Sequence, residues 1–429
     1  MKRPVVITLL IVALVLVCTG IGSVLFFTFN GGFPNNIIDA PLISTQSEES
    51  KTLNVDRPVS LTIVNESGRV AITGADVDEI TVDVVKTGLG TTQANATEAL
   101  ENIRYEIEQN GDTVRLTFEY PKIQTQIYQR VDFIVTVPVE TRVDVDAGSG
   151  EVSVSGTSGN VDVVNDFGTV KVDNIEGGLT VDTQSGQVEA VSINAGDEDI
   201  LLSSGFGKVT LEKATAADIS LTSNSGALEL NNVRASGRVE VSTDFGDASF
   251  TSGSADELTV ETNSGKVTLR QLNVNDALTV KDDFGSIELE QVNADSYDVH
   301  TNSGSVTIDG ASGNVRAHSD FGSVTLQNAE NVTVDLSTNS GSVDFEGSLG
   351  EGPHTIQSEF GEILVTIPAD SALDVDLKTD FGSIRSDIPI TVTLTGETDR
   401  NRQTGTMNEG GSQLTVETNS GGISIQASK

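Results

Sequence analysis

The chain has 429 residues with a formal net charge of −38 at pH 7, 42 glycines, one cysteine and no tryptophan. Such a negative charge repels nucleic-acid phosphates and anionic lipid headgroups, which argues against a nucleic-acid reader or a polybasic membrane binder. Cations or a basic partner would fit better, although acidic side chains also simply keep a strand-rich protein soluble.

The first expected element is a membrane anchor. An apolar run without a charge extends from Val5 to Phe29. At about 1.5 Å per residue, it is long enough to cross a bilayer core of roughly 30 Å. Lys2 and Arg3 precede it and no base follows closely, so residues 1–4 are predicted as a cytoplasmic tail and the rest as extracytoplasmic. A cleaved signal peptide is the alternative, but its apolar core would have only about 7 to 15 residues.

The only cysteine, Cys18, lies inside this run. A lipoprotein is not favoured, because Val17 stands where a small residue is expected and the apolar run continues beyond it. The exported part therefore has no cysteine for disulfides or metal sites. Residues 30–50 are rich in Gly, Pro, Asn and Ser and are predicted as a linker.

A glycine preceded by Ser or Phe recurs along the rest of the chain at steps of about 20 residues. Aliphatic residues occupy the positions two and four places after this glycine and five and seven places before it, with polar residues between them. This period-2 pattern predicts two short strands per repeat. The glycines are numbers 150, 168, 186, 207, 226, 246, 265, 285, 304, 322, 341, 361, 382 and 421.

One such repeat cannot bury its apolar face alone, but repeats stacked about 4.8 Å apart form a continuous core. The sequence thus predicts an all-β fold, a single-stranded β-helix or solenoid of about 15 short rungs. A string of β-hairpins is the alternative. It would expose the phenylalanines that precede alternate glycines, so we expect these rings to point inward, over the serines of adjacent rungs. They are Phe167, Phe206, Phe245, Phe284, Phe321, Phe360 and Phe381.

The two ends interrupt the repeat. Residues 59–75 fit it around Gly68, and a helix is predicted over 92–103. A hairpin should follow, with a turn at Asn110-Gly111 that pairs Ile107 with Val114, and helix and hairpin would cap the first rungs. Residues 51–146 are thus predicted as N-terminal rungs with this insertion and 147–429 as solenoid repeats. The last strand, 422–426, should close the stack.

The serial units "NSGxVxL" and "DFGxVxL", with "VDFIVTVP" before "VDVDAGSGEVSV" and "EFGEILVTIP" before "LKTDFGSI", carry a family resemblance. From about Lys51 to Lys429 the chain resembles the bacterial putative adhesin family of β-strand repeats, the toast-rack domain. The resemblance implies a β-helix at the cell surface or in the envelope, often anchored by one helix. It supplies no catalytic residues.

No motif points to catalysis or to a cofactor. Polysaccharide-cleaving β-helices need clustered carboxylates and aromatic platforms, and the four tyrosines are scattered. Asp244, Asp283 and Asp320 recur two places before glycine and are weak calcium candidates, although bends also favour such residues. His300 and His318 should be neighbours on adjacent rungs, but two imidazoles rarely hold a metal.

A further column, three places before the glycine, holds Ser or Thr with inward parity and predicts a hydrogen-bonded ladder at the edge of the core. Its members include Thr243, Thr262, Thr301, Ser319, Thr338, Thr379 and Thr418.

These observations favour a non-catalytic, membrane-anchored extracytoplasmic solenoid that binds an unidentified envelope or surface partner. The alternatives are an envelope-stress sensor, which so short a cytoplasmic tail disfavours, and a β-helix carbohydrate enzyme.

Overall fold

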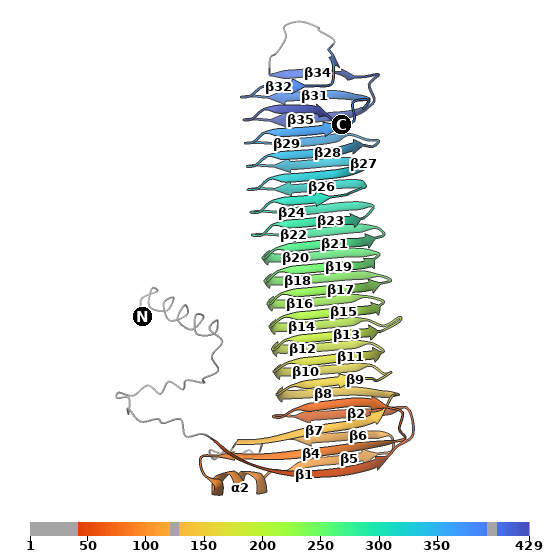
Figure 1. Ribbon diagram of the computed structural model, residues 1–429, viewed down its shortest axis with the longest axis vertical. Coiled ribbons are helices and arrows are strands. Elements are labelled where there is room, and N and C mark those ends of the chain that lie inside the picture. The colour runs from red at the N-terminus through yellow and green to blue at the C-terminus, as the bar shows by residue number, and fades with distance from the viewer. Residues whose placement is uncertain (1–41, 121–127, 393–400, 429) are drawn as a thin grey trace, which may run out of the picture. The chain divides into compact units, whose positions relative to one another are not determined.

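The computed structural model describes residues 42–120, 128–392 and 401–428. Residues 42–429 form one compact unit. Within the described ranges this unit consists of strands and a single short helix, arranged as a tall stack of coils (Figure 1). The predicted tail and anchor, residues 1–29, lie outside these ranges. In the described part of the chain, no helix is long and apolar enough to span a bilayer.

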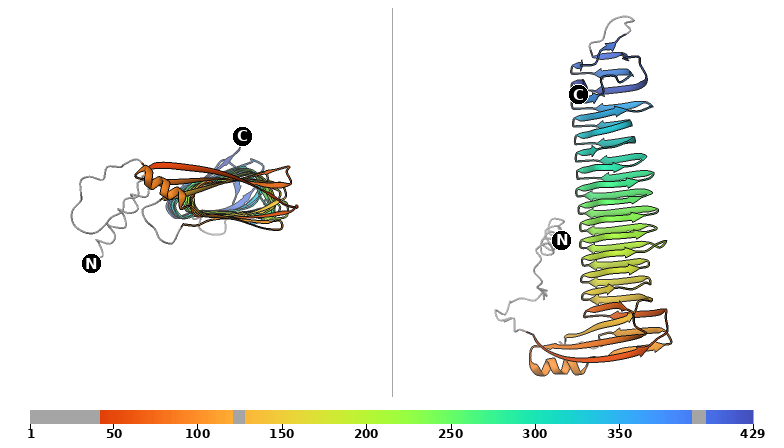
Figure 2. Two further views of the ribbon diagram at one scale, coloured as in Figure 1. Left: turned by 90° about the horizontal axis from the view of Figure 1, so that it is seen from below. Right: turned by 45° about the vertical axis from the view of Figure 1, so that its right-hand side comes forward.

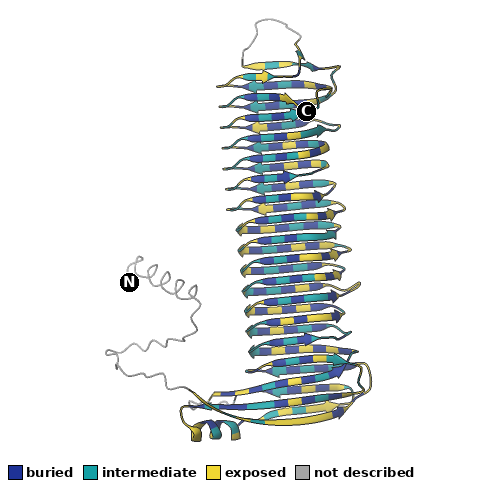
Figure 3. Cartoon of the chain, viewed as in Figure 1, coloured by how far each residue is buried: buried dark blue, intermediate teal, exposed yellow. Residues whose placement is uncertain are grey.

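Each central coil is flattened and contains two strands, one on each broad face (Figure 2). Side chains alternate along the strand before each glycine bend: in β18 (Arg238–Phe245), Val239 and Val241 are buried while Glu240 is exposed. In the strand after the bend, a residue with positive φ, such as Lys213, shifts the alternation by one residue. Parallel pairing in register places Val241 beside Val260 of the next coil, so buried residues form columns through the stack (Figure 3). The predicted solenoid, with its core between two faces, is therefore confirmed.

The first face contains the strand that leads into each glycine bend. Its central members are β8 (Thr141–Ser149), β10 (Val161–Phe167), β12 (Leu179–Ser185), β14 (Ile200–Phe206), β16 (Ile219–Ser225), β18 (Arg238–Phe245), β20 (Glu257–Ser264), β22 (Ala277–Asp282), β24 (Ser296–Thr301), β26 (Gly313–Ser319) and β29 (His354–Ser358).

The second face contains the strand that follows the bend. Its central members are β9 (Val152–Ser155), β11 (Val170–Glu176), β13 (Val188–Asn194), β15 (Val209–Ala216), β17 (Leu228–Ala235), β19 (Ala248–Ala255), β21 (Val267–Val274), β23 (Ile287–Asn293), β25 (Val306–Asp309), β28 (Val343–Leu349) and β30 (Ile363–Ile367). The long strand β27 (Val324–Thr338) begins in the second face, beside β25, and continues into the first, beside β26 and β29.

The bend between the faces is closed very tightly. A Cβ on Gly285 would lie 1.8 Å from the carbonyl oxygen of Gly265, and the other glycines of this column are packed similarly. The predicted hydroxyl ladder lies directly beside them. Thr301 donates its hydroxyl to the carbonyl oxygen of Gly285 at 3.0 Å, and Ser319 donates to that of Gly304 at 2.7 Å. Adjacent coils are therefore joined by side chains as well as by backbone hydrogen bonds.

At the N-terminal end the coils do not follow chain order. The coil of β2 (Val59–Asn65) and β3 (Val70–Ala75) lies between β8/β9 and a coil of β6 (Thr113–Phe118) and β7 (Tyr128–Pro138). Antiparallel strands cover that outermost coil: β5 (Tyr105–Asn110) pairs with β6, and β4 (Glu79–Gly90) pairs with β7. The predicted cap is thus largely an outer coil, and the solenoid begins with β6/β7 rather than at Val59.

The predicted helix is present as α2 (Gln93–Glu101), with Thr92 as its N-cap. The predicted hairpin has a different register, because Ile107 pairs with Leu116 rather than with Val114. Its two turn residues are Gly111 and Asp112, not Asn110 and Gly111. Only Gly111 has a positive φ, +61°, and a turn with glycine at its first central position shifts the pairing by two residues.

The predicted linker extends too far, because β1 (Ile43–Asn54) includes its last eight residues and pairs antiparallel with β4. All but two of the β1 residues from 43 to 52 are exposed. A strand at the edge of a sheet buries little, so its sequence lacks the apolar alternation that identifies a central strand. The predicted domain boundary at residue 147 falls inside β8.

At the C-terminal end, the coil of β35 (Ser412–Thr418) and β36 (Ile423–Ala427) lies between β29/β30 and a coil of β31 (Leu373–Thr379) and β32 (Ile384–Ser386). The prediction that the last strand closes the stack is therefore wrong. The outermost strands are β34 (Arg402–Met407), antiparallel to β31, and β33 (Ile390–Thr391).

The regular part between these ends has about 11 turns. The predicted figure of about 15 rungs treated the ends as further regular repeats.

Candidate functional site

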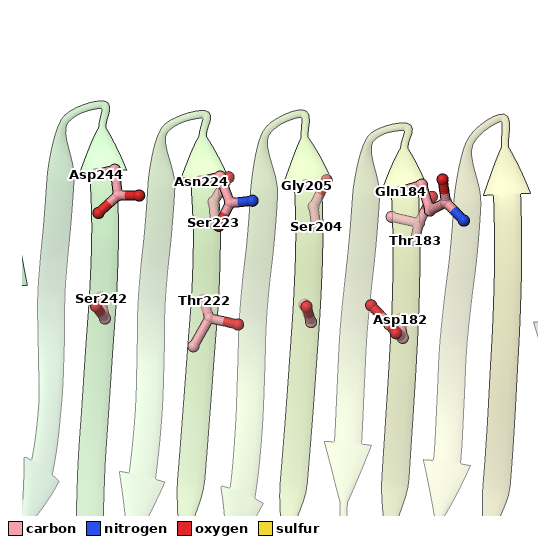
Figure 4. Close-up of a pocket in the computed structure, with 11 residues that line it drawn as sticks. Asp182, Thr183, Gln184, Ser204, Gly205, Thr222, Ser223, Asn224, Ser242 and Asp244 are labelled. Atoms are coloured by element: carbon pink, nitrogen blue, oxygen red, sulfur yellow. The ribbon is translucent and has the colours of Figure 1, made fainter.

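A shallow pocket of about 290 Å³ lies on the first face, beside the bend (Figure 4). It exists because Gly205 has no side chain at a position where adjacent coils carry Gln184 and Asn224. Hydroxyl groups form its floor, and Asp182 and Asp244 lie at its two ends. The pocket is thus a polar depression in a ladder of outward side chains.

The two carboxylates of this pocket do not form a hydrolytic pair. Asp182 belongs to β12 and Asp244 to β18, three coils away, which separates them by about 14 Å. Glycosidases place their carboxyl groups about 5 to 9.5 Å apart. The lining residues also include no His, Lys, Arg or Tyr. This arrangement can bind water or polar groups, but it does not support the carbohydrate-enzyme alternative.

The calcium candidates Asp244, Asp283 and Asp320 do not converge. They lie on alternate coils, about 9.6 Å apart, whereas calcium–oxygen distances are about 2.3 to 2.6 Å. The intervening coils carry asparagines, which donate amide hydrogens to them: Asn263 to Asp244, Asn302 to Asp283 and Asn339 to Asp320, at 2.7–2.9 Å. In the ranges described above, no group of three or more His, Cys, Asp or Glu residues could hold a metal ion.

His300 and His318 are neighbours on β24 and β26, as predicted. Their rings are stacked, with centroids 5.2 Å apart and an interplanar angle of 7°. Hydrogen bonds join His300 to Asn302 and His318 to Ser337 and Asp320. These contacts stabilise the outer face.

The phenylalanines lie outside the solenoid, so the prediction that they point inward is wrong. Their exposed fractions run from 57% for Phe167 to 81% for Phe381. The inward parity of the strand ends where the bend begins. Inside the bend, the packed glycines and the side chain of the residue two places before the phenylalanine, such as Thr243 before Phe245, leave no room for a ring. The β-helix is confirmed, but not by the aromatic column. The parallel pairing between adjacent coils distinguishes it from a string of hairpins, whose strands would pair antiparallel.

The aromatic column alternates with serine through the whole regular stack. Phe167 lies between Ser149 and Ser185, and Phe206 lies between Ser185 and Ser225. At the C-terminal end, chain order would place Phe360 beside Phe381. The inserted coil separates them with Ser420, which restores the alternation in space.

One buried acid interrupts the hydroxyl ladder and escaped the sequence analysis. Asp282 is 2% exposed and occupies the position that is Thr262 and Thr301 on the adjacent coils. Burial raises the pKa of its carboxyl group from 3.8 to about 6. Its Oδ1 accepts a hydrogen bond from the backbone of Phe284, while Oδ2 has no partner. The column parity was the available signal, since it places this acid inside.

Comparison with known proteins identifies a family. The family described as Toastrack DUF4097 matches residues 59–254 and 250–426. A search of curated proteins found no match.

Three solved structures are similar at low identity. A putative cell adhesion protein from Clostridium sporogenes is 10% identical over 90% of this chain and 100% of its own, with a TM-score of 0.17. A putative adhesin from Bacteroides fragilis is 16% identical over 61% and 96%, with a TM-score of 0.26. A putative adhesin from Parabacteroides merdae is 10% identical over 70% and 95%, with a TM-score of 0.20. At these scores, no residue role can be transferred from them.

Proposed function

The chain belongs to the Toastrack DUF4097 family, and from this premise we propose that it is a membrane-anchored, adhesin-like β-solenoid outside the cytoplasm. In this proposal Val5 to Phe29 forms the anchor and residues 1–4 the cytoplasmic tail. The solenoid binds a partner in the cell envelope or on a surface and catalyses no reaction.

The outward aromatic column is the observation that carries this proposal. Burying a Phe side chain is worth about 1.5 to 3 kcal/mol, yet seven rings in one line remain exposed. Exposed apolar groups that recur on one surface usually mark an interaction site. The stack of paired coils holds the rings in a fixed line. Such a line is better suited to binding a long partner than to catalysis at a single site.

Topology and retention can be tested with the full-length chain. Alkaline phosphatase fused after Lys429 should be active, and green fluorescent protein fused at the same place should be dark, because only the phosphatase matures outside the cytoplasm. The reverse pattern would contradict the proposed localisation. Cells that display the chain should retain envelope fragments more strongly than cells that display a neutral β-solenoid. Equal retention by both would contradict a role in adhesion.

A further inference from the structure

We propose that the phenylalanine edge docks an extended, basic polypeptide that carries a cationic side chain at about every third residue. This proposal deepens the proposed function and rests on it for the cellular setting. The phenylalanine edge consists of seven rings and the acids that directly precede six of them. The rings are Phe167, Phe206, Phe245, Phe284, Phe321, Phe360 and Phe381, and the acids are Asp166, Asp244, Asp283, Asp320, Glu359 and Asp380.

The bend does not require these rings. Every second coil has serine at the same position and forms the same bend, as Ser225 and Ser264 do on either side of Phe245. The glycines that follow Ser225 and Phe245 are packed equally tightly, with hypothetical Cβ atoms 1.9 and 2.2 Å from the carbonyl oxygen of the preceding coil. The aromatic side chain is therefore not needed for the backbone conformation of the bend, and it changes only the surface.

The spacing of the rings selects the form of the partner. Successive rings are two coils apart, about 9.6 Å. One turn of a polyproline II helix has three residues and spans about 9.3 Å, whereas side chains three residues apart in a β-strand point to opposite faces. A chain that runs along the edge as polyproline II therefore presents one side chain to every ring if that side chain recurs every third residue.

The charge of the edge selects the chemistry of those side chains. Asp244, Asp283 and Asp320 precede their rings directly, and the asparagines of the intervening coils hold these carboxylates in place. An ammonium or guanidinium group can lie over a ring and near the adjacent carboxylate at the same time. A second copy of this chain would bring acid against acid, and the net charge of −38 opposes that pairing.

The test compares two peptides on the purified full-length chain. One repeats Lys-Pro-Pro and the other Lys-Pro-Pro-Pro, with eight lysines in each. Both form polyproline II, but their lysines recur at about 9.3 and 12.4 Å, so only the first stays in register with the rings. We expect calorimetric titration to show at least about 10-fold tighter binding of the first peptide, which weakens as salt is raised. Equal affinities would overturn the proposal.

The Phe→Ser variants borrow the serine that the chain itself uses at this position on adjacent coils, so that they fold. Phe245→Ser, Phe284→Ser and Phe321→Ser together should weaken binding of the first peptide at least about 10-fold. The control, Val164→Ser with Leu201→Ser, removes two exposed apolar side chains away from the edge and should change affinity less than 2-fold. An equal loss in both variants would show non-specific apolar binding and overturn the proposal.

A second pair of variants isolates the charge. Asp244→Asn, Asp283→Asn and Asp320→Asn together should weaken binding about 5-fold or more, because each removes one carboxylate beside a ring. The control removes three exposed acids from the first face, through Asp144→Asn, Glu240→Gln and Asp298→Asn. Equal effects of the two triple variants would show attraction by net charge alone and overturn the proposal.

Two further outcomes separate this proposal from the proposed function. If the triple Phe→Ser variant still retains envelope fragments as the wild type does, the edge is not the docking surface, although the adhesive function stands. If the wild type binds the first peptide in register but retains no fragments, the adhesive function fails and this proposal stands. Self-association that sedimentation detects in the wild type and not in the triple Phe→Ser variant would identify a second copy as the occupant and overturn the proposal.

Discussion

The central coils of the solenoid, from β8 to β30, succeed one another in space as they do in the chain, whereas each end contains a coil inserted out of order. At the N-terminal end β2/β3 lies between β6/β7 and β8/β9. At the C-terminal end β35/β36 lies between β29/β30 and β31/β32. In both cases an internal segment forms the outermost coil, and antiparallel strands cover it.

The difference teaches that matching side chains, and not succession along the chain, decide which coils are neighbours. The inserted C-terminal coil places Ser420 between Phe360 and Phe381 and continues the aliphatic columns with Ile423 and Ile425. A simple parallel stack would also end in a row of unpaired backbone N–H and C=O groups, which can pair with another chain and cause aggregation. Insertion places β2/β3 and β35/β36 each between two coils, and antiparallel strands cover the open rows of β6/β7 and β31/β32.

The largest expected effect comes from removal of the inserted coil. Truncation after Glu409 deletes β35/β36, so β31/β32 loses both partners that join it to β30. Hydrogen exchange should then show loss of protection in β31, β32 and β34, by about 100-fold or more. Protection from β8 to β26 should be unchanged, because each coil contacts only its neighbours. Retained protection of β31 would mean that it can pack directly on β29.

The next effect contrasts two glycines. Gly285→Ala places a Cβ 1.8 Å from a backbone carbonyl in the central stack and should lower the free energy of unfolding by about 3 kcal/mol or more. Gly422→Ala in the inserted coil meets its nearest atom at 3.4 Å and should cost less than about 0.5 kcal/mol. Denaturant titration measures both, and similar losses would contradict the tight central bend.

A smaller effect concerns the buried acid of the central ladder. The folded-state pKa of Asp282 is raised to about 6, so its carboxyl group destabilises the fold increasingly as pH rises from about 4 to 6 and fully above that range. Asp282→Thr restores the residue of the adjacent coils. The difference in free energy of unfolding between this variant and the wild type should rise in favour of the variant by roughly 2 to 3 kcal/mol between pH 4 and pH 7.

The measurement is the difference in unfolding free energy between the two proteins at each pH, which cancels the titration of all other groups. A difference that does not change with pH would show that Asp282 titrates normally.

The smallest effect is expected at the phenylalanine edge. Phe284→Ser should change the free energy of unfolding by less than about 0.5 kcal/mol, because the ring is 68% exposed. Leu289→Ala in the same coil is the matched control, and it should cost about 2 to 5 kcal/mol because Leu289 is 1% exposed. Thermal or denaturant unfolding that ranks them equally would place the ring inside the fold.

The regular middle was predictable because its signals are local and repeated. Its aliphatic columns, hydroxyl ladder and neighbouring histidines follow from strand parity and period. Outside it, α2 was predictable from its N-cap. The aromatic column was predicted on the wrong side, because parity does not continue through a bend packed as tightly as that at Gly285. The inserted coils could not be predicted from the sequence repeat. A repeat shows which residues occupy equivalent positions, but it does not show the order in which the coils stack.

The phenylalanine edge was predictable only in part, and the polar pocket at Gly205 was not predicted. The residues of the edge were identified from the sequence, but their exposure was not, and the alternation at Phe360, Ser420 and Phe381 becomes regular only in space. Asp282 escaped notice because one acid among hydroxyl residues does not disturb the pattern of a column.

Disulfide formation tests the order of the coils most directly. Leu364 lies beside Ser424 on the adjacent coil, and Ser424 lies beside Arg385 on the next. With Cys18 replaced by serine, Leu364→Cys with Ser424→Cys should oxidise to a disulfide, since their Cα atoms are about 4.8 Å apart. Leu364→Cys with Arg385→Cys should not, at about 9.6 Å. Ready bridging of the second pair and not of the first would show that the coils stack in chain order, and would contradict this account.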